Sequence, residues 1–236
     1  MDITNSSSDP SNIWKTFERT SKEGHIKQFW IQSLPDSHIE IAVNYFTECF
    51  VKEEPICRAM NVMETEGGLE AMKNIWRNAI SEKCCLACFT KDDKNEHKLV
   101  ALNLCYKSSS SSQKTESHSY QTINDYISNF KNLYQMFNVD GYLGSVGLIT
   151  LPEYRGYNIG KELLESRKYL CQELGLKLAV TLFTGPASQR LAEKAGYKDV
   201  YPVSIDEIEK ENPHLIIPNL RNFTKKLRLM YILYDF

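Results

Sequence analysis

The chain has 236 residues, of which 42% are hydrophobic and 25% are charged, so it is long enough to bury the core of one large domain. A formal net charge of -2 argues against a nucleic-acid-binding protein, which normally has a basic face. No apolar run approaches the roughly 20 residues that a membrane helix requires, and the N-terminus has no signal-peptide core, so we expect a cytoplasmic protein that binds neither membranes nor nucleic acid.

Seven cysteines are scattered through apolar segments. Cys85 and Cys88 form a C-x-x-C motif, but no second pair and no nearby pair of histidines completes a zinc site. We therefore expect reduced, mostly buried thiols and no bound metal.

The first part of the chain predicts a flexible start followed by a strand and a helix. Residues 1–23 are rich in Ser, Asn and Asp and are expected to be flexible. Residues 25–34 have the pattern of a strand, which Pro35 ends. Ser37 and Glu40 then have the spacing of a capping box, which predicts that a helix begins at Ser37.

The rest of the chain alternates between strand and helix patterns. A Ser-rich segment at residues 107–119 is too polar to pack and is expected to form a mobile loop. The other expected elements are, in chain order, a helix from Gly67, a hairpin over 84–90 and 97–107, a helix over 120–137, a strand over 141–150, a helix from Lys161, a strand over 177–183, a helix over 187–195 and a strand over 227–234.

Residues 146–164 predict a strand, a tight turn that contains glycine, and a helix. The free backbone N–H groups and the positive end of the helix dipole would both face the turn, and this geometry binds phosphate. The turn is not a Walker loop, because Lys161 is followed by Glu162 and the glycine spacing is one residue short. It also lacks the three glycines of a Rossmann fingerprint.

Two adjacent carboxylates, Glu53 and Glu54, follow the first predicted helix and precede Pro55. The proline disfavours helical angles at Glu54, so the chain bends there. Carboxylates are also poorly placed at a helix C-terminus, where the dipole favours cations. They are either two solvated acids, or one of them is turned into a cleft as a general base.

The turn R-G-Y-N-I-G at residues 155–160 resembles the pyrophosphate loop of the GCN5-related N-acetyltransferases, which hold acetyl-coenzyme A. Asn158 stands where the middle glycine is usual, but asparagine tolerates left-handed backbone angles, so the loop can still close. The segment F-V-K-E-E-P-I at residues 50–56 is similar to one of the insect arylalkylamine N-acetyltransferases and their paralogues. In that family the glutamate before the proline is the catalytic base, a role that falls on Glu54.

A third motif, A-E-K-A-G-Y at residues 192–197, resembles the second motif of the superfamily. Many members have a tyrosine at the position of Ala192 that protonates the departing thiolate, and this chain lacks it. The insect subfamily instead has two hydroxyls four residues apart, and Thr184 and Ser188 fall on them. Without that role, Thr184 would be an ordinary strand-end residue and Ser188 a first-turn helix residue.

The resemblance implies an α/β (α+β) fold in which residues 24–236 form one domain. Its mixed, mostly antiparallel sheet would be flanked by helices, with splayed strands at the acetyl-CoA site. It also implies a monomer or weak dimer that transfers an acetyl group from acetyl-CoA to the primary amine of a small arylalkylamine by direct attack. Glu54 would be the base, and Ser188 and Thr184 would donate to the leaving sulfur.

The residues implied to bind acetyl-CoA are Leu148, Ile149, Thr150, Arg155, Gly156, Tyr157, Asn158, Ile159, Gly160 and Lys161. Two alternatives stay open at this point. The chain is a superfamily enzyme for polyamines, other amines or other acyl donors, or it is a non-catalytic acyl-CoA-binding protein that kept the fold.

Overall fold

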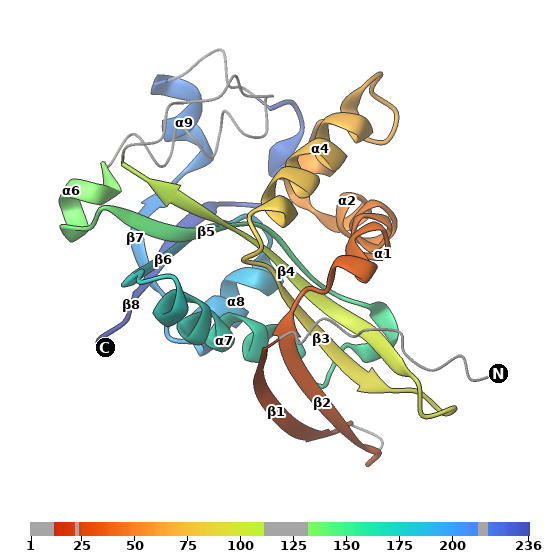
Figure 1. Ribbon diagram of the computed structural model, residues 1–236. Helices are drawn as coiled ribbons and strands as arrows, with labels where there is room; N and C mark the ends of the chain where they lie inside the picture. Colours follow the sequence, from red (N-terminus) through yellow and green to blue (C-terminus); the bar gives the residue numbers. More distant parts are fainter. Residues whose placement is uncertain (1–11, 22–23, 111–131, 212–216) are drawn as a thin grey trace.

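The computed structural model describes residues 12–21, 24–110, 132–211 and 217–236, and its central element is an eight-stranded sheet (Figure 1). The strand order is β1-β2-β3-β4-β5-β6-β8-β7, and β5 and β6 are parallel whereas every other neighbouring pair is antiparallel. The predicted fold class is therefore confirmed.

The strands are β1 (Ile13–Thr20), β2 (Ile26–Ser33), β3 (Leu86–Lys91), β4 (His97–Ser109), β5 (Gly141–Thr150), β6 (Leu178–Phe183), β7 (Lys198–Val203) and β8 (Leu227–Leu233). The helices are α1 (Ile39–Tyr45), a π-helical turn (Phe46–Phe50), α2 (Val51–Glu53), α3 (Pro55–Ala59), α4 (Gly68–Ser81), α6 (Leu133–Phe137), α7 (Ile159–Glu173), α8 (Pro186–Lys194) and α9 (Ile205–Glu211).

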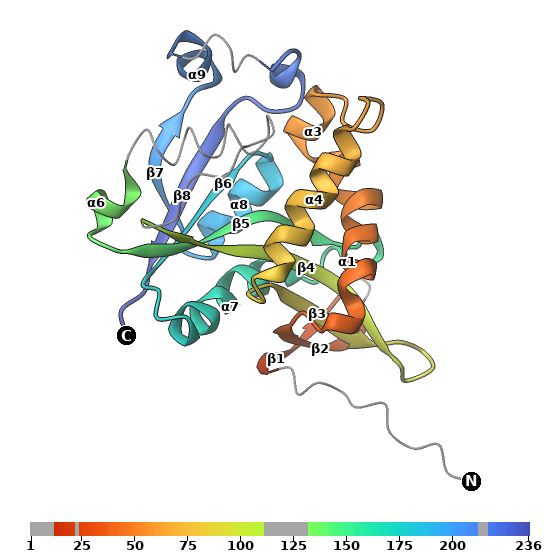
Figure 2. The same ribbon diagram turned by 45° about the horizontal axis from the view of Figure 1, so that its top comes forward.

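Helices cover both faces of the sheet, as Figures 1 and 2 show for α1 and α4 on one side and α7 on the other. Successive residues of β3 alternate between the two cores, as the pleat of a strand requires. Leu86 and Cys88 pack in the cluster that contains the apolar face of α7, whereas Ala87 and Phe89 pack in the cluster that contains Trp76 of α4.

The expected flexibility of residues 1–23 is wrong for Ile13–Thr20, which form the edge strand β1. β1 pairs with β2, and its side chains Lys15 and Arg19 form ion pairs with Glu162 of α7. The polar residues of this segment therefore have partners elsewhere in the fold, which its composition could not indicate. Residues 1–11 and 22–23 lie outside the described residues.

The predicted capping box at Ser37 is also wrong. Residues Asp36–His38 form a 3-10 turn after Pro35, and α1 begins only at Ile39, with His38 as its N-cap and no side-chain capping bond. The hydroxyl of Ser37 is instead 3.0 Å from Nδ1 of His38.

The first three residues of the predicted Ser-rich loop belong to a strand, because β4 continues to Ser109, which pairs with Gly141 of β5. The prediction of a mobile loop is wrong for these residues, and 111–119 lie outside the described residues. Of the helix predicted over 120–137, residues 132–137 are described and contain the short helix α6.

The seven cysteines are free thiols, and six of them are buried, which confirms the expected burial; Cys49 is half-buried. Within the described ranges, no three His, Cys, Asp or Glu side chains are grouped so that they could hold a metal. None of the helices in the described part of the chain has the length and apolarity needed to cross a membrane.

Candidate active site

The parallel strands β5 and β6 separate to form a cleft. In the described strands they pair at one position only, Leu143 with Ala179, and beyond it their C-terminal halves diverge. The facing backbone edges of both strands are therefore open. The cleft between them has a volume of 470 Å³ and is bordered by β5, β6, the residues after α1 and the starts of α7 and α8.

A β-bulge in β5 contributes to this separation. Leu104 of β4 pairs with Gly147, but the adjacent Cys105 pairs with Ser145, so β5 has one extra residue at this point. Asn103 fixes the bulge, because its Nδ2 donates to the hydroxyl of Ser145 and to the carbonyl of Gly147, both at 2.8 Å. Bulges bend a strand and are frequent beside active sites.

The fully buried side chain of Arg167, from α7, bonds to β6 directly and to the bulge of β5 through Asn103 of β4. Its Nε donates to Oδ1 of Asn103 at 2.7 Å, and its Nη1 donates to the hydroxyl of Thr181 in β6 at 2.8 Å. Arg167 and Thr181 both line the cleft. The sequence analysis missed this network, because its members come from three elements and have no common motif.

The turn at residues 155–160 closes, as the sequence predicts, with Asn158 in place of a glycine. Gly156 has φ +96° and Asn158 has φ +60°, so Asn158 adopts the left-handed conformation that a glycine would normally provide. A Cβ atom at Gly160 would lie 3.0 Å from Leu191 of α8, so a glycine here lets the first turn of α7 approach α8 closely.

Eight of the ten residues implied to bind acetyl-CoA line the cleft, and Tyr157 and Lys161 do not. The ring of Tyr157 packs against Phe29 in the core with 5.3 Å between ring centroids, and the ammonium of Lys161 pairs with Glu165 on the same helix. These two residues support the loop from outside the cleft.

Glu54 is the buried carboxylate of the cleft. It has extended angles, φ -71° and ψ 126°, and it caps α3 by accepting a 2.6 Å hydrogen bond from the backbone N–H of Cys57. Burial raises the pKa of Glu54, whereas its hydrogen bonds to Thr184 and the backbone oppose the rise. The sequence left open whether both acids are solvated or one is turned into a cleft, and the structure shows Glu54 turned into the cleft.

Glu53, in contrast, is exposed and bound to Arg155 of the turn at residues 155–160. Both of its carboxylate oxygens accept from Nη2 of Arg155, at 2.9 and 2.8 Å, and Nε of Arg155 donates to the carbonyl of Thr150 at 3.2 Å. This ion pair connects the two sides of the cleft. Glu54, by comparison, forms no ion pair with any described residue.

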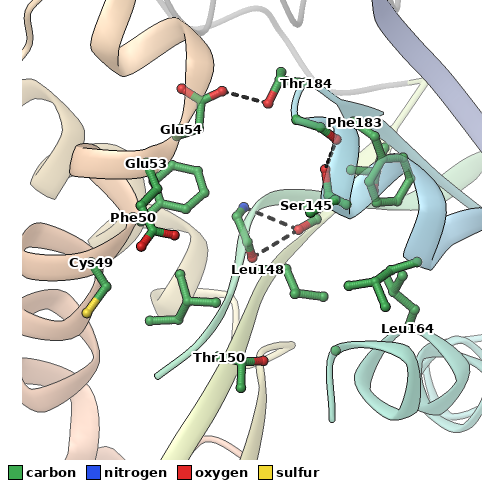
Figure 3. Close-up of a pocket in the computed structure, with 18 of the residues that line it drawn as sticks. Cys49, Phe50, Glu53, Glu54, Ser145, Leu148, Thr150, Leu164, Phe183 and Thr184 are labelled. Carbon is green, nitrogen blue, oxygen red and sulfur yellow. Dashed lines mark hydrogen bonds between the residues drawn. The ribbon is translucent and has the colours of Figure 1, made fainter. Parts of the chain in front are cut away.

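The two predicted hydroxyls both line the cleft but have different partners. The hydroxyl of Thr184 donates to Glu54 at 2.6 Å, from the opposite wall (Figure 3). The hydroxyl of Ser188 donates to the carbonyl of Gly185 at 2.9 Å. Thr184 thus contacts the carboxylate, which the sequence analysis did not foresee, and Ser188 must rotate before it could donate to a ligand.

Apolar side chains form much of the cleft wall, and two of them, Phe50 and Phe183, were not singled out as site residues from the sequence. Phe50 and Phe183 lie on opposite sides, with Leu148 of β5 between them (Figure 3). The cleft thus combines a tight glycine-containing turn at a helix N-terminus, an open strand edge, a buried carboxylate and an apolar wall. Such a site can hold a phosphorylated, extended cofactor beside an amine.

No protein-family model matches the chain, and no curated protein sequence matches it. Solved structures do match. A protein designated arylalkylamine N-acetyltransferase 7, from the yellow fever mosquito Aedes aegypti, superposes with a TM-score of 0.85 at 25% identity over 98% of both chains. Arylalkylamine N-acetyltransferase 2 of Aedes aegypti has a TM-score of 0.72 at 16% identity, over 88% of this chain and 99% of that one. A polyamine N-acetyltransferase of Drosophila melanogaster has a TM-score of 0.68 at 16% identity, over 87% and 100%.

The fold and its cleft define the class: the chain is an acyltransferase with the GCN5-related N-acetyltransferase fold. Within that superfamily its structure is similar to that of an insect arylalkylamine N-acetyltransferase.

Proposed function

We propose that this protein transfers the acetyl group of acetyl-CoA to the primary amine of a small arylalkylamine of the dopamine, tryptamine or serotonin type. The observation that carries the proposal is the buried carboxylate of Glu54, which lies in the cleft between the separated strands and next to a phosphate-binding loop. The cytoplasmic location and a monomeric or weakly dimeric state stay predictions.

The donor site uses two features of the cleft. The pantetheine arm would pair with the open backbone edge of residues 148–150, as an added strand does. The pyrophosphate would lie at the N-terminus of α7, where backbone N–H groups and the helix dipole favour an anion. Arg155 is already at this loop and would exchange its bond to Glu53 for one to the pyrophosphate.

The proposed reaction begins with a proton transfer. An alkylamine has a pKa of about 10 and is protonated in water, so it needs a base before it can attack. Glu54 would take the proton directly or through a water, and its raised pKa makes it a better base than an exposed carboxylate. The free amine then attacks the thioester carbon, and the C–S bond breaks to release the CoA thiolate. The nitrogen loses its second proton, which would pass through the hydroxyl of Ser188 to the thiolate, so that the products are a neutral amide and a free thiol.

The walls of the cleft favour an aromatic monoamine over a polyamine. Phe50, Phe183 and Leu148 offer apolar surface, and Glu54 offers one carboxylate for one ammonium. A polyamine needs further acids for its other charges. Among the described lining residues the one other carboxylate is Glu53, which is exposed at the rim and not buried beside Glu54.

The test is thiol release from acetyl-CoA by the wild type and by Glu54→Gln, measured with tryptamine, dopamine, tyramine, histamine, putrescine and spermidine. Glutamine can keep the acceptor for Cys57 but cannot take a proton at neutral pH. We expect turnover with the aromatic amines and a loss of about 10² to 10⁴ in kcat/KM for Glu54→Gln.

The matched control is Glu48→Gln, which changes an exposed acid of the preceding turn and should leave turnover at the wild-type level. Turnover with putrescine or spermidine alone would move the acceptor to the polyamines. Measurable acetyl-CoA binding without turnover of any of these amines would instead favour the binding-protein alternative.

A further inference from the structure

The closed end of the cleft is polar and carries a positive charge. Ser145 and Thr181 line it from the two strands, each two residues beyond the single β5–β6 pair, and Arg167 lines it from α7. The reaction proposed above gives no role to any of the three.

The guanidinium of Arg167 has only neutral hydrogen-bond partners. They are Asn103, Thr181 and, at 3.3 Å, the hydroxyl of Tyr197, and no carboxylate of the described residues forms an ion pair with it. Burial by itself lowers the pKa of this group, but its interactions with Tyr197 and Cys105 raise the pKa by more than burial lowers it. The side chain therefore stays charged. A buried cation without an anionic partner lowers the stability of the fold, so its presence here points to a functional role.

The acyl group of a bound donor would extend toward this charge. The thioester carbon must lie near Glu54 and Thr184 at the open end of β6 for the amine to reach it. Thr181 is three residues nearer the strand junction, which corresponds to a depth of about 10 Å at the usual rise per residue. The thioester and the acyl chain together have to fit within that depth.

We propose that Arg167 limits the acyl donor to short, uncharged chains such as acetyl. This inference rests on the proposed function only in that an acyl-CoA occupies the cleft. The methylene groups of a longer chain would have to pack against a guanidinium that is already cut off from water, or displace the hydroxyls that bond to it. An acetyl group would be too short to reach the guanidinium or these hydroxyls.

The test compares acetyl-, butyryl-, hexanoyl- and succinyl-CoA with the wild type, Arg167→Met and the control Arg77→Met. Methionine keeps a long apolar side chain but removes the charge, and Arg77 is half exposed on α4, outside the cleft. Affinity is measured by calorimetry, and kcat/KM is measured with tryptamine. We expect the wild type and Arg77→Met to prefer acetyl-CoA over hexanoyl-CoA by at least about tenfold, and Arg167→Met to lose most of this preference.

The wild-type affinities can overturn the inference even if Arg167→Met does not fold. Equal affinity for hexanoyl- and acetyl-CoA would overturn the inference, and so would tighter binding of succinyl-CoA, which would mean that Arg167 is there to pair with a donor carboxylate. An unchanged preference in a folded Arg167→Met would also overturn it. If the acyl-CoA ranking holds but no amine is acetylated, the proposed function fails and the inference on Arg167 stands.

Discussion

The hydroxyl of Thr184 stabilises the charged form of Glu54, although the carboxyl is buried. Burial is the dominant influence and raises the pKa of Glu54, while the hydrogen bond from Thr184 opposes it. A base must be ionised to accept a proton, so activity should fall as the pH falls through this raised pKa. The acid limb of the pH–rate profile should therefore lie above the range of an ordinary glutamate.

Replacing Thr184 by valine should move that acid limb to higher pH. Valine has nearly the same shape but no hydroxyl, so the carboxylate loses a charge-assisted hydrogen bond and its pKa rises further. We expect kcat/KM for tryptamine to be lower by about tenfold near neutral pH and to recover on the alkaline plateau. The measurement is kcat/KM against pH for both proteins, compared as a ratio so that ionisation of the amine cancels.

The same profile separates two roles for Thr184. If its hydroxyl served mainly as the acid that protonates the leaving sulfur, the loss in Thr184→Val would persist on the alkaline plateau. Ser188→Ala is the comparison variant, because Ser188 donates to Gly185 and not to Glu54. Its acid limb should stay at the wild-type position.

At the scale of elements, the π-helical turn Phe46–Phe50 packs very closely on β5. A Cβ atom at Gly147 would lie 2.3 Å from Cε1 of Phe46 and 3.1 Å from the ring of Phe50. The ring of Phe46 is fully buried and lies 5.3 Å from that of Trp76, so it has little room to retreat. Gly147 is thus the contact that lets the helix side of the cleft approach the bulged strand.

We expect Gly147→Ala to destabilise the protein by about 1–3 kcal/mol, as overpacking of a core usually does. Phe46→Leu in the same chain frees part of the ring volume and should recover some of that loss. The free energy of unfolding of the two single variants and the double variant, from urea titrations, gives the coupling. Strictly additive losses would show that Gly147 and Phe46 do not conflict in this way.

How far the sequence predicts the site depends on the range of the interactions that form it. The strand, the glycine turn and the helix around residues 146–164 are local, and the angles of Asn158 follow from its own chemistry. The bulge at Ser145 and its link to Arg167 need side chains from β4, β5, β6 and α7 to meet. Neither propensity nor spacing indicates such a meeting, so the closed end of the cleft could not be predicted.

At the scale of the whole molecule, ion pairs connect the edge strand β1 to the helix α7. Glu162, in the first turn of α7, is 1% exposed, and its carboxylate pairs with Lys15 at 2.5 Å and with Arg19. The two ends of this contact are more than 140 residues apart in the sequence. For that reason a polar N-terminal segment that predicts flexibility contributes an ordered strand to the sheet.

Removing the charge of Glu162 should loosen this connection. In Glu162→Gln the ammonium of Lys15 and the guanidinium of Arg19 lose their anion, but both are partly exposed and can turn to water. We therefore expect a loss of about 1–3 kcal/mol in the free energy of unfolding, less than for a fully buried pair.

Urea titration measures this loss, with Glu165→Gln as the control. Glu165 is 33% exposed and pairs with Lys15 and Lys161, so its replacement should cost less than about 1 kcal/mol. Equal losses in the two variants would mean that burial gives the Glu162 pairs no additional strength.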